Sequence, residues 1–404
     1  MDDTDTERSR PVGISKLAVI GPLAFLAAMA QGNLGLGLLF HARDALLASK
    51  AQTGLLAGIW FLAYMISCHL FRPLSHRLRP RFCVLGACFV LAALTALLAA
   101  APSLGLAYLL NGLLGAAAAS FWPPLMGWVS ANAEGGRLSR RLGTFNLCWS
   151  SGAILSPALA GWGHELSSRL PLVASAILYL AAGLLIALAV VALPGIGKDD
   201  DAHEREQRGV PREPGADGTP LRFPAWAGVF STYLVAGVLL NVFPMAGRTE
   251  LHLRASDVGR LLLLRAFATS AGLWILGRTA WWHFRGGQMV AATALLGASL
   301  LWLGSARSMA GIGAALVAAG ALSAFGYVNS LFHGAVGSSR RVARMAIHES
   351  LLSAGLCCGA SLGGVVYQRV GITPLLTGCA VLMGATASIQ LVLLAACRRP
   401  RPDR

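Results

Sequence analysis

Charged residues are scarce in this chain, and carboxylates are the scarcest of them. Asp, Glu, Lys and Arg make up 13% of the 404 residues, against roughly 25% in an average soluble domain. Only 18 residues are acidic, and most of them lie in the termini, the loops and one polar segment. This composition excludes an ordinary soluble domain, and the few acids offer no Ser/His/Asp arrangement for nucleophilic catalysis.

Several other kinds of site are missing as well. The eight cysteines contain no CxxC pair, and the histidines show no metal-ligand spacing, so we expect neither a disulfide framework nor a metal site. No glycine loop of the Walker type occurs, which argues against direct use of ATP, and we expect no cofactor. The net charge of +15 is spread over many short loops, so nucleic acid is not an expected partner.

Long apolar stretches dominate what is present. Hydrocarbon offers no hydrogen-bond partner to a backbone, so each crossing must be a helix of roughly 20 apolar residues. The sequence predicts an all-α membrane protein, embedded in a lipid bilayer, with twelve transmembrane helices. The predicted spans are 17–40, 52–71, 82–101, 104–128, 143–162, 171–194, 224–246, 258–280, 288–304, 309–335, 346–367 and 372–396.

The basic residues indicate the orientation of these spans. With a cytoplasmic N-terminus and alternating loops, cytoplasmic segments hold 24 Lys and Arg residues and external loops hold 8. This bias follows the positive-inside rule. We therefore predict a multi-pass protein of the cell membrane, inner or plasma, with cytoplasmic tails at 1–16 and 398–404. The first apolar stretch has spanning length and no convincing cleavage site, so it is a helix and not a leader.

The spans form two groups of six, 17–194 and 224–397, joined by a polar cytoplasmic linker at 195–223. A pattern of small residues recurs in spans five and eleven at a displacement of 203 residues, which predicts two pseudo-symmetric six-helix bundles. Such a stripe lets a neighbouring backbone approach closely. It serves helix packing or, as an alternative, hinge-like sliding. The residues concerned are Gly152, Ser156 and Pro157 in the first half and Gly355, Gly359 and Gly363 in the second.

Two segments resemble the major facilitator superfamily of secondary transporters. The segment 72–81, RPLSHRLRPR, is similar to the family's loop of the form GxLaDRxGRR, with Arg77 and Arg81 kept and His76 in the acidic position. This resemblance implies a gating loop at His76, Arg77 and Arg81. The segment 152–161, GAILSPALAG, resembles the GxxxGPxxGG pattern that the family associates with export. The resemblance implies two bundles that rock around a midplane cavity.

Two charges lie well inside predicted spans, where a charge costs several kcal/mol unless it has a partner or a watery cavity. Glu349 would carry a proton, with His348 tuning that step; alternatively it pairs with Arg340, Arg341 or Arg344 near the membrane boundary. Arg265 would be a counter-ion for an anionic solute or for Glu349. The alternative for Arg265 is that it extends to the outer interface.

Polar and aromatic residues on the spans that line the cavity in this family are predicted to contact the solute. Amides fix the orientation of a ligand, and aromatic rings bind apolar or cationic groups. Each of them alone would otherwise join two helices or anchor an interface. The set is Gln31, Asn33, Asn111, Trp122, Asn146, Trp149, Tyr233, Asn241, Tyr327 and Asn329.

The sequence thus predicts a secondary transporter that moves a small solute, is coupled to protons through Glu349 and acts as a monomer. The segment 152–161 favours export of a partly apolar compound, whereas Arg265 favours an anionic one, and both readings stay open. The competing class is a non-transporting receptor or scaffold with the same fold. A membrane enzyme is a third class, but the His and acidic cluster that it needs is not found.

Overall fold

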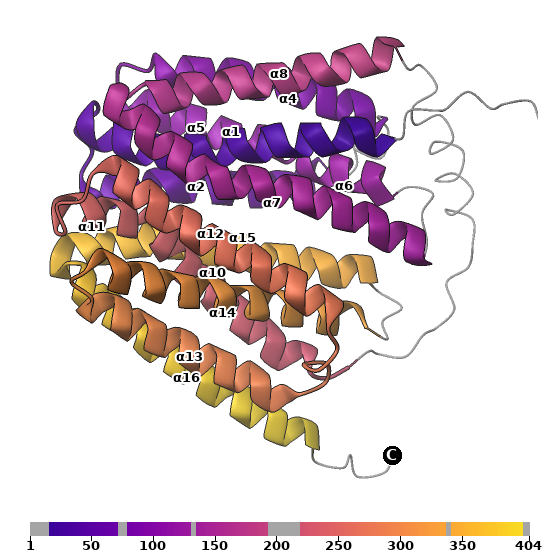
Figure 1. Ribbon diagram of the computed structural model, residues 1–404, viewed down its shortest axis with the longest axis vertical. Coiled ribbons are helices and arrows are strands. Elements are labelled where there is room, and N and C mark those ends of the chain that lie inside the picture. Colours follow the sequence, from indigo (N-terminus) through magenta and orange to yellow (C-terminus); the bar gives the residue numbers. More distant parts are fainter. Residues whose placement is uncertain (1–15, 72–78, 131–134, 193–218, 337–340, 399–404) are drawn as a thin grey trace, which may run out of the picture.

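The computed structural model describes residues 16–71, 79–130, 135–192, 219–336 and 341–398. In these ranges the chain is helical, without strands (Figure 1). The helices of the first half are α1 Lys16–Asp44, α2 Lys50–Leu70, α4 Pro80–Ala99, α5 Leu104–Ala118, α6 Trp122–Ser130, α7 Gly135–Leu166 and α8 Leu170–Ala192.

The helices of the second half are α10 Arg222–Asn241, α11 Phe243–Thr249, α12 Ala255–Arg278, α13 Gly286–Ser305, α14 Met309–Ala335, α15 Arg341–Val370 and α16 Ile372–Arg398. Within the described residues, eleven helical segments are long and apolar enough to cross a membrane. The helix α7, whose sequence contains several polar and small residues such as Asn146, Ser150 and Ser151, is not among the eleven. Counted with α7, they give the twelve spans predicted from the sequence.

Two predicted spans are interrupted. The span at 104–128 consists of α5 and α6, separated by turn residues 119–121, and Pro123 and Pro124 directly follow the first residue of α6. The span at 224–246 ends its first helix at Asn241, and Pro244 lies in the first turn of α11. Proline has no N–H to donate and its ring clashes with the preceding turn, so a helix restarts there more easily than it continues.

We call the end of the molecule that carries the α1–α2, α7–α8 and α11–α12 connections the distal end, and the opposite end the linker end. At the distal end, Ser49 and Gln52 fix where α2 begins. The Ser49 side chain accepts a hydrogen bond from the Gln52 amide at 3.2 Å, and the Gln52 side chain accepts one from the Ser49 amide at 2.8 Å. This capping box satisfies amides that the first helical turn leaves free.

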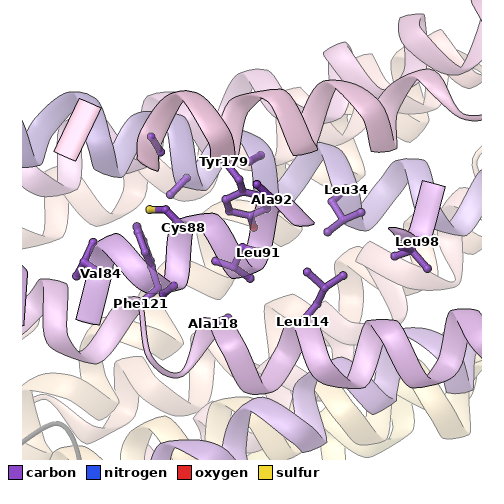
Figure 2. Packing of buried hydrophobic residues seen from close by; sticks show 14 of the residues in the cluster. Leu34, Val84, Cys88, Leu91, Ala92, Leu98, Leu114, Ala118, Phe121 and Tyr179 are labelled. Carbon is purple, nitrogen blue, oxygen red and sulfur yellow. The ribbon is translucent and has the colours of Figure 1, made fainter. Parts of the chain in front are cut away.

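Each half has its own apolar core. Figure 2 shows part of the first, where Cys88 and Leu91 of α4 lie near Tyr179 of α8, and Val84 lies near Phe121. The second core is built mainly by α10 to α16, but it also contains Leu36, Leu39, Phe40 and Ala160 from the first half. These residues lie toward the distal end, so the two bundles share buried apolar contacts there.

Close backbone contacts confirm that the two halves are pseudo-symmetric. A Cβ added at Gly152 would meet Phe25 O and Met29 N of α1, and one added at Gly355 would meet Phe230 O and Leu234 N of α10. The two glycines are 203 residues apart, and both pairs of neighbours are 205 apart. Spans five and eleven therefore pack on spans one and seven in the same way, as close small-residue packing in membranes requires.

The same symmetry relates the two interfaces between the bundles. A Cβ at Gly259 of α12 would clash with Pro157 O of α7, and a Cβ at Gly54 of α2 would clash with Ala360 O of α15. Figure 1 shows α7 beside α12, where the two halves meet. At both sites the backbone of one bundle touches the backbone of the other, which only a residue without a side chain permits.

Candidate functional site

Polar contacts between the bundles gather at the distal end. Asp44 of α1 accepts a hydrogen bond from Arg248 of α11 at 2.6 Å and contacts His164 of α7 at 2.8 Å. Nearby, Lys50 lies 3.5 Å from Glu250. The Ser256 amide, at the start of α12, also donates to the Glu165 side chain of α7 at 3.1 Å. Together with the shared apolar core, these contacts close the distal end.

A group of charged and aromatic side chains lies in the interior between the bundles. Glu349 of α15 acts electrostatically on Tyr64 of α2, Tyr233 of α10 and Tyr327 of α14. Arg265 of α12 acts on Tyr233 as well. Five helices, one from the first half and four from the second, thus bring these five residues together. We call them the central cluster.

Arg265 is a buried cation without a partner. Its side chain is 6% exposed, and its Nε has no hydrogen-bond partner among the described residues. The backbone explains the burial, since α12 and α14 touch at Arg265 O and Gly320. The side chain does not extend to the outer interface, which was the alternative prediction. A buried charge left unpaired in a membrane protein is a functional candidate.

Glu349 is surrounded by protein yet accessible to solvent. It forms no ion pair or hydrogen bond with a described residue, and it lies within electrostatic reach of tyrosines from both bundles. Of its predicted partners, Arg340 and the Arg341 side chain lie outside the described residues, and the buried Arg344 forms no ion pair with Glu349. A carboxylate in this position is free to bind a proton or a cation that enters from an open end.

His348 lies beside Glu349 but turns toward α14. Its Nδ1 is 2.8 Å from Ser330 Oγ, and its ring centroid is 5.1 Å from that of Tyr327. The Tyr327 and Tyr233 ring centroids are 6.2 Å apart. His348 is fully buried, so it holds Tyr327 and α14 in place and does not share the accessible position of Glu349.

Four of the predicted residues form bonds that join helices of the first half. Asn33 of α1 donates to Pro171 O at 2.7 Å and to Ser175 Oγ at 2.8 Å in α8. Asn111 of α5 donates to Leu56 O of α2 at 2.7 Å. Trp122 of α6 donates to Gln31 of α1 at 2.7 Å, and both side chains are half-buried. These contacts are of the helix-joining kind that was the alternative prediction for each residue.

Two predicted amides of the second half bond to their own helices. Asn241 donates to Gly237 O at 2.9 Å, and Asn329 donates to Phe325 O at 2.9 Å. Asn329 Oδ1 and Gln390 Oε1 are buried acceptors without partners. Both residues line a small pocket among α10, α13, α14 and α16 with room for about one water molecule. This pocket lies inside one bundle, and two of its lining residues, Thr232 and Gly326, are the chain neighbours of Tyr233 and Tyr327.

The remaining predicted residues are placed as follows. Asn146 of α7 is exposed and Trp149 is half-buried against the first core. In the predicted gating loop, His76 and Arg77 lie outside the described residues. The Arg81 side chain, in the first turn of α4, is 7% exposed and lies 5.1 Å from the centroid of the Phe82 ring.

Sequence reasoning missed Tyr64 and Trp60 of α2, whose rings stack at a centroid distance of 5.3 Å. A helical spacing of four residues is a signal for such a pair, but nothing in the sequence shows that it faces the other bundle. It also missed Asp44, His164 and Arg248, which are ordinary residues of helix ends until the fold brings them together.

Replacing Asn33 by Ala tests whether it packs helices or binds solute. Because two hydrogen bonds between α1 and α8 are lost, we expect the free energy of unfolding to fall by about 1–3 kcal/mol, measured by thermal unfolding of the purified protein. Asn146→Ala, at an exposed position, is the control and should change it by no more than about 0.5 kcal/mol. Unchanged stability combined with lost solute uptake would make Asn33 a solute contact instead.

Comparison with known proteins shows which family has this architecture. The sequence matches the profile of the Major Facilitator Superfamily over residues 20–337, which is most of the chain. The chain belongs to the major facilitator superfamily. None of the curated proteins matches this sequence.

Solved structures of this superfamily share the fold of the whole chain. A bacterial homologue of the human lysosomal transporter Spinster superposes with a TM-score of 0.75 at 12% identity, covering 96% of this chain and 98% of that one. The nucleoside transporter NupG gives 0.72 at 14%, covering 96% and 100%. A POT family transporter in complex with a thioalcohol-conjugated peptide gives 0.74 at 11%, covering 95% and 97%. At these identities the likeness concerns the fold, and the solute must be argued from the chain itself.

Proposed function

We propose that this member of the superfamily is a proton-coupled secondary transporter that acts as a monomer and exports a small solute. The observation that carries the proposal is Glu349. It is an accessible carboxylate that pairs with none of the described residues, placed where helices of both bundles meet. Such a group can exchange a proton on each side of the membrane when the bundles rock around it.

The closed end of the molecule agrees with this mechanism. The bundles are held together at the distal end by backbone contacts, apolar residues and the Asp44–Arg248 pair. We propose that the distal end is external and that the termini and the linker are cytoplasmic, as the 24 basic residues in the corresponding segments favour. In this state the solute enters from the cytoplasm, and opening of the distal end releases it.

Export is the direction that the segment 152–161 favours, and Arg265 adds a cationic site for a negatively charged group of the solute. Outside protons would bind Glu349 after the solute leaves and be released inside. Because an unpaired buried charge is costly, binding of an anionic solute group to Arg265 would be favoured. The proposal assigns no enzymatic step to the chain.

Reconstitution into sealed vesicles tests this proposal. Vesicles containing the purified protein and a pH-sensitive dye are exposed to individual small amphipathic solutes. We expect at least one solute gradient to move protons in the opposite direction, and an imposed pH gradient to drive accumulation of that solute. Protein-free vesicles are the control. A protein that moves no solute and no protons across a broad panel would be the receptor or scaffold that the sequence left open.

A further inference from the structure

The two charged members of the central cluster form no ion pair with any residue that the structure describes. Arg265 is 6% exposed and forms no ion pair with a described residue, and the accessible Glu349 forms none either. Both act electrostatically on Tyr233, so they lie in one region of the protein. The buried Arg265 bears the cost of several kcal/mol that an unpaired charge has in a membrane interior, whereas Glu349 is exposed to solvent. A pair of opposite charges that the protein leaves unsatisfied implies a ligand that satisfies both.

The helices keep these charges too far apart to pair with each other. Arg265 of α12 lies at the same height along the bundle as Gly320 of α14, because the backbones of the two helices touch at these residues. Tyr327 follows seven residues later on α14, about two helical turns or on the order of 10 Å toward the linker end. His348, the neighbour of Glu349, contacts Tyr327 and Ser330 at that level. Arg265 therefore lies on the distal side of Tyr327, and Glu349 lies near the level of Tyr327.

The side chains between the two charges suit the body of an amphipathic molecule. Tyr233 and Tyr327 are half-buried, and their rings are inclined by 39° at a centroid distance of 6.2 Å. On the other bundle, Tyr64 stacks on Trp60. Aromatic faces bind both apolar chains and ammonium groups. A cation near Glu349 would thus meet a carboxylate and several ring faces.

We propose that the transported solute is a zwitterion whose anionic group binds Arg265 and whose cationic group binds Glu349. The inference rests on the proposed transport function and specifies its solute class. The guanidinium of Arg265 offers paired donors to a carboxylate. A solute with one charge leaves the other protein charge unpaired, so the site discriminates against simple cations and simple anions. Because Arg265 and Glu349 lie at different heights along the helices, the two charges of the solute must be separated by several bonds.

A series of ω-amino acids of increasing chain length measures this preference directly. The purified full-length protein is titrated, without any gradient, with compounds from 4-aminobutanoate to 10-aminodecanoate, and binding is read from the shift in thermal unfolding. Alkylammonium ions and alkanoates of equal length are the single-charge comparisons. We expect one chain length to bind best and its single-charge counterparts to bind about 10- to 100-fold more weakly, as loss of a charged hydrogen bond predicts.

Two variants locate the binding groups. At the best chain length, Arg265→Gln should reduce affinity to that of the alkylammonium ion, and Glu349→Gln should reduce it to that of the alkanoate. Arg260→Gln and Asp257→Asn change an exposed pair on the same helix α12 and should leave affinity unchanged. Equal binding of singly charged compounds, insensitivity to both variants, or no binding of any ω-amino acid would each overturn the inference.

These outcomes are separate from those that test transport. If ω-amino acids bind as expected but no solute crosses the vesicle membrane, the proposed transport function fails and the zwitterion site stands. If vesicles transport only uncharged or singly charged solutes, the zwitterion site fails and the transport function stands.

Discussion

Replacing both Gly54 and Gly259 by Val is expected to open the distal end of the protein. Gly54 touches Ala360 of α15, and Gly259 touches Pro157 of α7, in each case through the backbone. A backbone carbonyl cannot turn aside as a flexible side chain can. The added carbon atoms must therefore push the two bundles apart at the end where they are now closed.

The expected destabilisation of the closed distal end follows from the cost of overpacking, which is typically about 1–3 kcal/mol at one site. The two glycines lie in symmetry-related interfaces with separate partners, so their effects should add to about 2–6 kcal/mol. A tenfold change in an equilibrium constant corresponds to about 1.4 kcal/mol. The equilibrium between closed and open distal ends should therefore shift by roughly 30-fold to 10⁴-fold toward the open state.

Spin labels at Leu47 and Met309, introduced as cysteines in a cysteine-free background, measure this shift. Both positions are exposed at the distal end, Leu47 in the first half and Met309 in the second. We expect a longer distance between the labels in the double variant. Gly86→Val with Gly105→Val is the matched control, because a Cβ at either site meets nothing within 4 Å. A distance distribution equal to that of the control, in a monodisperse protein, would refute the close-approach argument.

Much of the fold could be predicted because the sequence shows directly the long apolar stretches and the internal repeat that determine it. Hydrocarbon demands long apolar helices, and the repeat between Gly152 and Gly355 at 203 residues reflects a real equivalence of contacts. Two interruptions were not predicted. Pro123 and Pro244 lie within apolar stretches whose hydropathy hides the break, although proline chemistry explains it afterwards.

The central cluster could be predicted only in part. Arg265 and Glu349 stand out because charges are rare in spans, and Tyr233 and Tyr327 because they lie on the expected helices. The sequence does not show which way a side chain faces when a helix is apolar on all sides. For that reason Asn33 and Asn111, predicted to contact the solute, prove to join helices, and Tyr64 was missed.

Replacing Glu349 by Gln is expected to abolish the accumulation of solute driven by a pH gradient. Glutamine keeps the size and a carbonyl oxygen but carries no titrating proton, so the cycle loses its coupling group. Glu349 forms no bond with a described residue whose loss would disturb the fold. The free energy of unfolding should therefore stay within about 0.5 kcal/mol of that of the unchanged protein. The measurement is the ratio of solute concentrations inside and outside the vesicles, made with the solute that the vesicle screen identifies.

A variant that is uncoupled, and not merely inactive, retains exchange of solute for solute. At saturating solute on both sides, Glu349→Gln should still exchange labelled for unlabelled solute, because that reaction requires the bundles to rock but requires no proton. Glu165→Gln, which changes an acid at the distal surface, is the comparison and should keep gradient-driven accumulation. Full accumulation by Glu349→Gln would assign proton coupling to another group. Loss of exchange as well would show that Glu349 is needed for solute binding itself, since no proton gradient enters that measurement.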